Sequence, residues 1–435
     1  MREPSLEEHQ DVLEEGDHTI EVSAARAALA SRDFRTVWLG GFASNIGTWM
    51  QNVVLGAYAY ELTESPTFVS LITLAQLGPM LALSIVGGLL ADTFDRRRLL
   101  LLTQSMQLVA AVLLTALVAA DHDDANKAAI IALVLFGGVF NALNAPAWVA
   151  LLPSLVRREH LSGAISLNST QMNASRVIGP AVAGVLFSAL GAAVVFGINA
   201  VTYLFAILGI WLVRTPQNPP RSSGPQGLRR LTEGFAVARR DPLLSRILVT
   251  IVAFSFLCLP FIGQMPTLAA ENLGMRPRSL AYGLLYASFG LGAVTGAVSI
   301  GTFLSGQDKH RIVRFGLAAF AVCLATFGLV RDPAPAYPLA AMVGFTYFAT
   351  VTSLNTVLQE HLDDAVRGRV MSLWLMGFGG TVPFGLMAAG PVAEATSITV
   401  VLLYGAATAA FLAWWCDLSR AAARQAAPDP RLATP

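Results

Sequence analysis

Apolar residues fill this chain in twelve stretches, each about long enough to cross a lipid bilayer as a helix. A hydrocarbon core of about 30 Å takes about 20 helical residues to cross, and in lipid only helices or closed barrels satisfy their backbone groups. Uninterrupted runs of this length therefore predict an all-α integral membrane protein. The expected spans lie near residues 36–60, 66–91, 98–120, 126–150, 162–189, 192–213, 246–270, 279–304, 311–331, 336–358, 367–393 and 396–418.

Basic residues separate these stretches in a regular order, because every second loop is basic. The basic segments hold Arg26, Arg32 and Arg35, then Arg96 to Arg98, Arg157 and Arg158, the central linker, Lys309, Arg311 and Arg314, Arg367 and Arg369, and Arg420 and Arg424. The alternate loops hold only Lys127, Arg276, Arg278 and Arg331. Cytoplasmic loops carry an excess of Lys and Arg, so this pattern predicts an even number of spans with both termini in the cytoplasm.

Composition supports the membrane assignment and excludes a soluble chain. Only 13% of residues are charged and 54% are hydrophobic, against about 25% charged in ordinary soluble proteins. The net charge of +1 gives no reason to expect a nucleic-acid partner. Cys258, Cys323 and Cys416 all lie in apolar stretches without metal or redox spacing, and we interpret them as small buried hydrophobic residues.

The chain divides into two sets of six spans around a central linker. We expect an acidic cytoplasmic tail (1–35), an N-terminal six-helix bundle (36–213), a cytoplasmic linker (214–245), a C-terminal six-helix bundle (246–418) and a second cytoplasmic tail (419–435). Between Leu228 and Leu244 the linker places Leu228, Leu231, Phe235 and Ala238 on one helical face. This pattern favours a short amphipathic helix on the inner leaflet, although a solvated linker remains the alternative.

The second half repeats landmarks of the first half in the same order. The matched pairs are Gly88 with Gly301, Asp95 with Asp308, Arg96 with Lys309, Arg98 with Arg311, Gly179 with Gly385, and Gly184 with Gly390. They predict two pseudo-symmetric six-helix bundles, with a substrate site between the bundles near the membrane midplane.

The loop from Gly87 to Arg97 resembles the signature that the major facilitator superfamily carries between its second and third helices. Gly88, Asp92, Arg96 and Arg97 match that signature, whereas Thr93 and Asp95 replace its usual Arg and Gly. Ser44 to Gln51 in the first helix is similar to the exporter branch that includes the enterobactin exporter. Arg176 to Pro180 partly matches the Gly-Pro motif of antiporters and exporters.

This resemblance covers about residues 36–418 and implies the major facilitator fold and transport by alternating access. It also implies gating residues, namely Gly88, Asp92, Arg96, Arg97, Gly179 and Pro180, with Asp92 in a latch that holds the halves together on the cytoplasmic side in the outward-facing state. Positive-inside topology alone would account for the arginines. Close packing and a bend would account for Gly179 and Pro180.

Arg176 is the only charge that the sequence places well inside a span. Because a charge at the bilayer centre costs about 2.5–3.5 kcal/mol, such a residue usually faces a cavity or a partner. Ser169, Asn173, Arg176 and Pro180 share one helical face, which could bind an anionic or carbonyl-rich substrate. A structural bond from Arg176 to another helix is the alternative.

The first helix carries a polar stripe in an otherwise apolar segment. We expect it to line the substrate cavity, although hydrogen bonds between helices would also explain it. The stripe comprises Ser44, Asn45, Thr48, Gln51 and Asn52. Weaker cavity candidates on other helices are Gln76, Asn141, Asn144, Gln264 and Asn355, together with Asn173 and Arg176 above.

No carboxylate lies deep in an expected span, so proton coupling is implied mainly by the resemblance. Glu61, Asp92 and Glu360 are the candidate proton carriers. The expected function is export of a small amphipathic molecule, drug-like or siderophore-like, by proton-coupled antiport; the alternative is an uncoupled facilitator or importer. We expect a monomer in the bacterial cytoplasmic membrane, with a small-molecule substrate, protons and lipid as partners, and no enzymatic activity, cofactor, metal or nucleic acid.

Overall fold

The computed structural model describes residues 24–120, 126–214, 228–304 and 306–416, and every regular element in this part of the chain is a helix. Eleven of these helices are long and apolar enough to cross a membrane. Outward-facing apolar side chains such as Phe205, Val322 and Trp414 are half or more exposed, as the lipid-facing surface of a membrane protein requires. The predicted all-α membrane fold is confirmed.

The N-terminal half contains six long helices. They are α2 (Arg32–Thr63), α3 (Pro66–Thr93), α4 (Arg96–Ala120), α5 (Lys127–Leu151), α6 (Leu161–Leu190) and α7 (Ala192–Trp211), with the short turns η1 (Leu152–Leu155) and η2 (Arg158–His160) before α6. Helix α2 is not among the eleven apolar helices, because its polar stripe lowers its hydropathy. At 32 residues it still exceeds the length of a span, and it completes the predicted twelve.

The C-terminal half has the same order, but two of its six spans are interrupted. The first span runs through α9 (Pro242–Ala253), η3 (Phe254–Cys258), α10 (Pro260–Gly263) and α11 (Met265–Glu271). Helices α12 (Leu280–Gly301), α13 (Lys309–Leu329) and α14 (Pro333–His361) are continuous. The fifth span joins α15 (Asp364–Leu375), η4 (Met376–Gly380) and α16 (Val382–Ala395), and α17 (Ile398–Trp415) is the sixth.

Proline explains the two interruptions. Both η3 and η4 are π-helical turns, and each is followed within three residues by a proline, Pro260 or Pro383. Proline has no N–H to donate and its ring clashes with the carbonyl four residues earlier, so the preceding turn widens.

Polar caps set where many of the helices begin. A side-chain oxygen just before the helix accepts a backbone N–H of its first turn, which would otherwise lack a partner. The residues that cap in this way are Ser31, Ser65, Asn126, Asp241, Ser279, Asp308, Asp332 and Ser397.

The linker helix α8 (Leu228–Arg240) packs against α15. Gly234 lies on the backbone of Arg369, and Glu233 forms an ion pair with Arg369 at 3.3 Å. Ala238 is buried while Phe235 is 63% exposed, so these two residues of the expected apolar face lie in different surroundings. The side chains of Leu228 and Leu231 lie outside the described residues.

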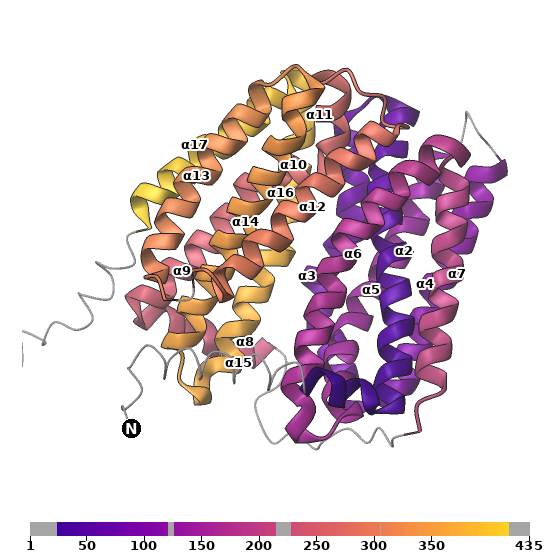
Figure 1. Cartoon of the computed structure of the whole chain (residues 1–435), viewed down its shortest axis with the longest axis vertical. Coiled ribbons are helices and arrows are strands. Elements are labelled where there is room, and N and C mark those ends of the chain that lie inside the picture. The colour runs from indigo at the N-terminus through magenta and orange to yellow at the C-terminus, as the bar shows by residue number, and fades with distance from the viewer. Residues whose placement is uncertain (1–23, 121–125, 215–227, 305, 417–435) are drawn as a thin grey trace, which may run out of the picture.

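The two halves lie side by side (Figure 1). We call the end where α2 begins and α17 ends the terminal end, and the opposite end the far end. Helix α6 packs against α12, and α3 packs against α16. At the far end, a Cβ added at Gly184 would lie 2.7 Å from the Cα of Gly283, so the backbones of α6 and α12 are in direct contact.

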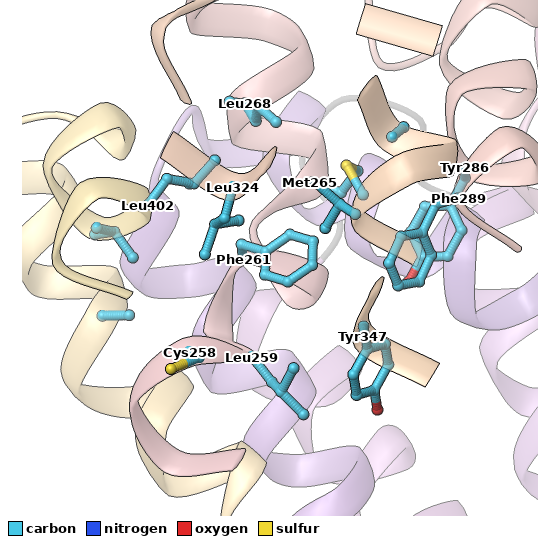
Figure 2. Packing of buried hydrophobic residues seen from close by; sticks show 14 of the residues in the cluster. Cys258, Leu259, Phe261, Met265, Leu268, Tyr286, Phe289, Leu324, Tyr347 and Leu402 are labelled. Carbon is cyan, nitrogen blue, oxygen red and sulfur yellow. The ribbon is translucent and has the colours of Figure 1, made fainter. Parts of the chain in front are cut away.

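Buried apolar residues fill the interior of each half. In the C-terminal half, Phe261 lies among Leu324, Met265 and Leu259, and all four are buried (Figure 2). The edge-on contact of Phe261 with Phe289, 5.8 Å between ring centroids, extends this core towards the aromatic residues that face the other half.

Candidate functional site

Arg176 lies at the middle of α6, about 21–22 Å along the helix axis from either end. Its guanidinium carbon is 4.9 Å from the ring centroid of Phe348 and 5.6 Å from that of Trp49. Trp49 belongs to α2 and Phe348 to α14, so the two rings come from opposite halves. The cation therefore sits at the boundary between the halves, held by cation–π contacts.

The N–H groups of Arg176 have no hydrogen-bond acceptor and no ion-pair partner among the described residues. The five N–H bonds of a guanidinium point outward in its plane, while aromatic rings contact its faces. The side chain is half-buried in the protein. The arrangement thus leaves the edge of a positive group available to a bidentate anion such as a carboxylate.

Aromatic residues continue the site along the C-terminal half. Tyr347 contacts Phe348 edge-on with centroids 4.4 Å apart, and Phe378 lies 6.4 Å from Tyr347. Trp374 stacks on Phe378 at 6.3 Å. Phe378 lies within the π-helical turn η4, so this irregular turn places an aromatic ring beside the central site.

Small residues allow the helices to approach Arg176 closely. A Cβ added at Gly179 would lie 2.6 Å from the Cβ of Trp49, and one at Gly290 would lie 2.6 Å from the carbonyl oxygen of Arg176. Pro180 is buried next to Gly179. In this structure the predicted Gly-Pro gating pair is closely packed. Close packing is the structural role that was the alternative to gating.

Two residues of the predicted polar stripe, Gln51 and Asn52, make hydrogen bonds inside the N-terminal half. Gln76 donates to Asn52 over 2.6 Å, and Asn199 donates to Gln51 over 2.6 Å. Asn144, which is buried, donates to Thr103 over 2.8 Å. These bonds agree with the interhelical role that was the alternative to cavity lining.

The remaining cavity candidates differ in their surroundings. Asn45, Thr48, Asn141 and Asn173 are half-buried on the N-terminal half. Asn355 is half-buried on α14 and accepts a hydrogen bond from Gln359.

Gln264 lies at the far end, between the halves. It is fully buried, and its amide nitrogen donates to the Pro66 carbonyl over 2.8 Å and to the Ser70 hydroxyl over 2.6 Å. Thr267 donates to its amide oxygen over 2.7 Å. The amide nitrogen therefore has an acceptor for each of its two N–H groups and the amide oxygen has a donor, and two of the three bonds join the halves.

All hydrogen bonds between described residues of the two halves lie at the far end. Besides those of Gln264, Tyr60 donates to Glu271 over 3.2 Å, and Arg278 donates to the Phe187 carbonyl over 3.1 Å. Glu394 accepts from the Ser65 hydroxyl over 2.9 Å and from the backbone N–H of Thr67 over 3.3 Å. The structure is therefore closed at the far end.

The predicted latch lies at the terminal end. Arg96 donates to the Ala150 carbonyl over 3.1 Å, and Arg97 donates to the Ile210 and Trp211 carbonyls, so both arginines bind within their own half. Asp92 is half-buried, and a Cβ at Gly88 would meet no atom within 4 Å. In this structure the latch residues do not bridge the halves through any bond between described residues.

The candidate proton carriers lie at opposite ends of the molecule. Glu61 lines a far-end cavity of about 260 Å³ together with Tyr58 and Arg278. Glu360 is exposed near the terminal end of α14. Twelve residues separate Glu61 from Trp49 and Glu360 from Phe348, about 18 Å along each helix, so neither carboxylate lies beside Arg176.

A further carboxylate at the terminal end joins the linker to α14. Asp241 lies 2.8 Å from Nε2 of His361 and accepts the backbone N–H groups of Leu243 and Leu244. Burial acts to raise the pKa of Asp241, but these hydrogen bonds outweigh it and hold the pKa below its usual value. The ionised carboxylate thus fixes the junction between α8 and α9.

Sequence reasoning missed the residues that surround Arg176. Trp49 appeared only as part of a motif, and nothing in the sequence pairs it with Phe348 of the other half. It also missed the bridging role of Gln264, which had been expected in the cavity. The sequence did contain one signal of an unusual position. Gln264 is a polar residue in an apolar stretch, and the nearby Pro260 and Pro266 indicate an interrupted helix there.

Comparison with known proteins identifies relatives along nearly the whole chain. The sequence profile of the family described as transmembrane secretion effector matches residues 23–434. The enterobactin exporter EntS of Shigella flexneri is 28% identical over 346 residues, which cover 78% of this chain and 80% of the relative. EntS of Shigella boydii serotype 4 is 26% identical over 350 residues, with the same coverage.

Solved structures of several transporters share the fold. A bacterial homologue of the human lysosomal transporter Spinster, in an inward-facing and unoccupied conformation, gives a TM-score of 0.70 at 15% identity and covers 92% of this chain and 99% of its own. A bacterial homologue of the iron transporter ferroportin in an inward-facing state gives 0.68 at 14% identity, covering 89% and 98%. The nucleoside transporter NupG gives 0.67 at 13% identity, covering 88% and 98%.

Proposed function

The chain belongs to the transmembrane secretion effector family of the major facilitator superfamily, and from this premise we propose that it exports a small amphipathic anion by alternating access. Its family and relatives are transporters and not enzymes, and the relatives export a small molecule. Their bacterial source implies the inner membrane as its location.

One observation carries the proposed substrate class. Arg176 presents a guanidinium edge without a partner among the described residues, at the middle of a span and between aromatic rings of both halves. A molecule with an acidic group and an aromatic or otherwise apolar body would pair with this edge and stack on Phe348 and Phe378. Siderophore-like and drug-like anions both have this chemistry.

The contacts between the halves indicate which state of the transport cycle this structure represents. With the basic terminal end in the cytoplasm, the closed far end faces outward, and this conformation would admit substrate from the cytoplasm. Export then requires the far-end hydrogen bonds to break while the terminal end closes. Asp92 is the residue that we propose to pair across the terminal end in that second state.

Two modes of coupling are open to such a carrier. Proton antiport would use Glu61, Asp92 or Glu360, the candidates implied by the family resemblance. An uncoupled facilitator needs no such group, and one observation favours it: the candidate carboxylates lie near helix ends, far from Arg176.

Binding measurements on Arg176 variants test the proposed site. We expect purified protein to bind naphthalene-2-sulfonate in a calorimetric titration, and Arg176→Gln to weaken this binding by about tenfold to a hundredfold, because a bond between charged groups contributes about 1.5–3 kcal/mol. Arg314→Gln is the matched control, since Arg314 is exposed near the terminal end of α13. Equal affinity in Arg176→Gln and the unchanged protein would refute the site.

A further inference from the structure

Arg176 places a permanent positive charge at the middle of the membrane, and this charge affects which energy source can drive transport. An arginine stays protonated at every physiological pH, so this charge cannot be removed by proton transfer. The site can become neutral only when an anion binds there.

Among the described residues that touch Arg176, none has a side chain whose charge changes near pH 7. The helices that touch it contribute Trp49 from α2, Gly290 from α12, and Tyr347 and Phe348 from α14. Tyr347 is the only one of these with an ionisable group, and a phenol is neutral near pH 7. Among the described residues, the charge at the site therefore changes only with the substrate.

We propose that the membrane potential acting on the substrate-free carrier, and not a proton gradient, drives export. This inference rests on the proposed function, because it needs an anion at Arg176. The loaded carrier would reorient with a neutral site, since the anion cancels the guanidinium. The empty carrier would reorient with one positive charge, which moves from the outside potential to the inside potential as access switches back to the cytoplasm.

The sign of this charge movement favours export. Bacterial cytoplasmic membranes are negative inside, so the return of the positively charged empty carrier is downhill. One cycle carries one negative charge outward for a monovalent substrate. A potential of 100 mV acting on one charge, about 2.3 kcal/mol, would sustain a concentration ratio of about 50-fold.

Proteoliposomes separate the potential from the pH gradient. The probe is naphthalene-2-sulfonate, whose acidic group stays ionised between pH 6 and 8, so that it does not cross the bilayer as a neutral acid. A 50-fold potassium gradient directed inward, with valinomycin, makes the lumen positive by about 100 mV at equal pH. A separate set of vesicles receives a pH step with equal potassium on both sides and valinomycin, so that no potential develops.

We expect the inside-positive potential to drive accumulation of the probe towards about 50-fold, and the pH step alone to drive none. Reversing the potassium gradient should prevent accumulation. Arg176→Lys keeps the charge and should keep the dependence on potential with weaker binding, whereas Arg314→Gln should behave like the unchanged protein.

The possible failures are distinct. Accumulation that follows the pH step and ignores the potential would overturn potential-driven export while leaving the anion site intact. Binding that does not depend on Arg176 would remove the proposed substrate site, and the inference with it. An Arg176→Lys protein that binds the probe but accumulates it without regard to potential would also overturn the inference.

Discussion

Gln264 is a single polar residue that joins the two halves at the far end. Its amide is fully buried at the far end and bonds to α3 of the other half. A buried amide that loses its partners costs free energy, so this side chain stabilises the state in which the two halves touch. It bridges the halves without charge, and its effect should therefore be insensitive to pH and salt.

Replacing Gln264 with leucine should open the far end. The variant loses two hydrogen bonds between the halves, together about 1–3 kcal/mol, which would shift the ratio of open to closed protein by about 5-fold to 150-fold. Spin labels at Ala189 and Thr396, both exposed at the far end and in opposite halves, would report a longer distance in pulsed electron spin resonance.

Gln359→Leu is the control for this prediction, because Gln359 is exposed near the terminal end and, among the described residues, bonds only to Asn355 of its own helix. The labels require replacement of the three native cysteines, all of which are buried. An unchanged distance distribution in Gln264→Leu would mean that other contacts hold the far end closed.

At the scale of elements, the contact of α6 with α12 brings the backbones of the two halves together. Gly184 and Gly283 meet with their backbones in contact, and Gly290 lies on the carbonyl of Arg176 about two turns further along. Small residues permit such contacts, and close packing is a main source of helix association in lipid. The same helix pair therefore closes the far end and supports the proposed substrate site.

A bulkier residue at this crossing should separate the two helices. Gly283→Val places a branched side chain against the backbone of Gly184, and overpacking of this kind costs about 1–3 kcal/mol. We expect a longer distance between labels at Ala189 and Thr396 and a large loss of transport. Gly301→Val in the same helix is the matched control, because a Cβ there meets no atom within 4 Å; equal effects of the two variants would contradict the prediction.

At the scale of the whole molecule, the two halves are joined at one end and along the middle. At the far end, Gln264 and Glu394 bond to the other half. Near the centre, Gly380 lies against Leu81 of the other half, because a Cβ added there would meet the Leu81 side chain. Alternating access requires the opposite arrangement as well, with the terminal end closed. The predicted latch residues Arg96 and Arg97 bond within their own half in this state, so closing the terminal end would require them to exchange partners.

Asp92→Asn should therefore impair turnover without weakening the binding of substrate to the present conformation. We expect transport to fall by about tenfold or more, because a bond to a charged group contributes about 1.5–3 kcal/mol. Labels at Phe94 and Phe303, exposed at the terminal end on opposite halves, should keep the distance that they have in the unchanged protein. Asp95→Asn should transport normally, because Asp95 bonds locally to the backbone N–H of Arg98. An equal loss of transport in Asp95→Asn would contradict the latch and indicate that the whole loop matters only for membrane topology.

Several features could be predicted from the sequence because they depend on local composition. The span positions follow from apolar runs, and the helix starts at Ser65, Ser279 and Ser397 follow from capping side chains. Arg176 could be singled out as a candidate binding residue because a charge in a span is costly. The polar stripe was also identifiable, but periodicity gives only the face of a helix and not the neighbour, so it could not show that Asn52 meets Gln76.

By itself, the sequence determined that this protein is a helical membrane protein with two repeated halves, because hydrophobicity and charge act residue by residue along the chain. Only the tertiary structure decided which residues meet across the halves. Trp49, Arg176 and Phe348 lie far apart in the chain, and their contact depends on how α2, α6 and α14 pack. The closed far end was decided in the same way, because Gln264 and Glu394 contribute to it only through partners from the other half.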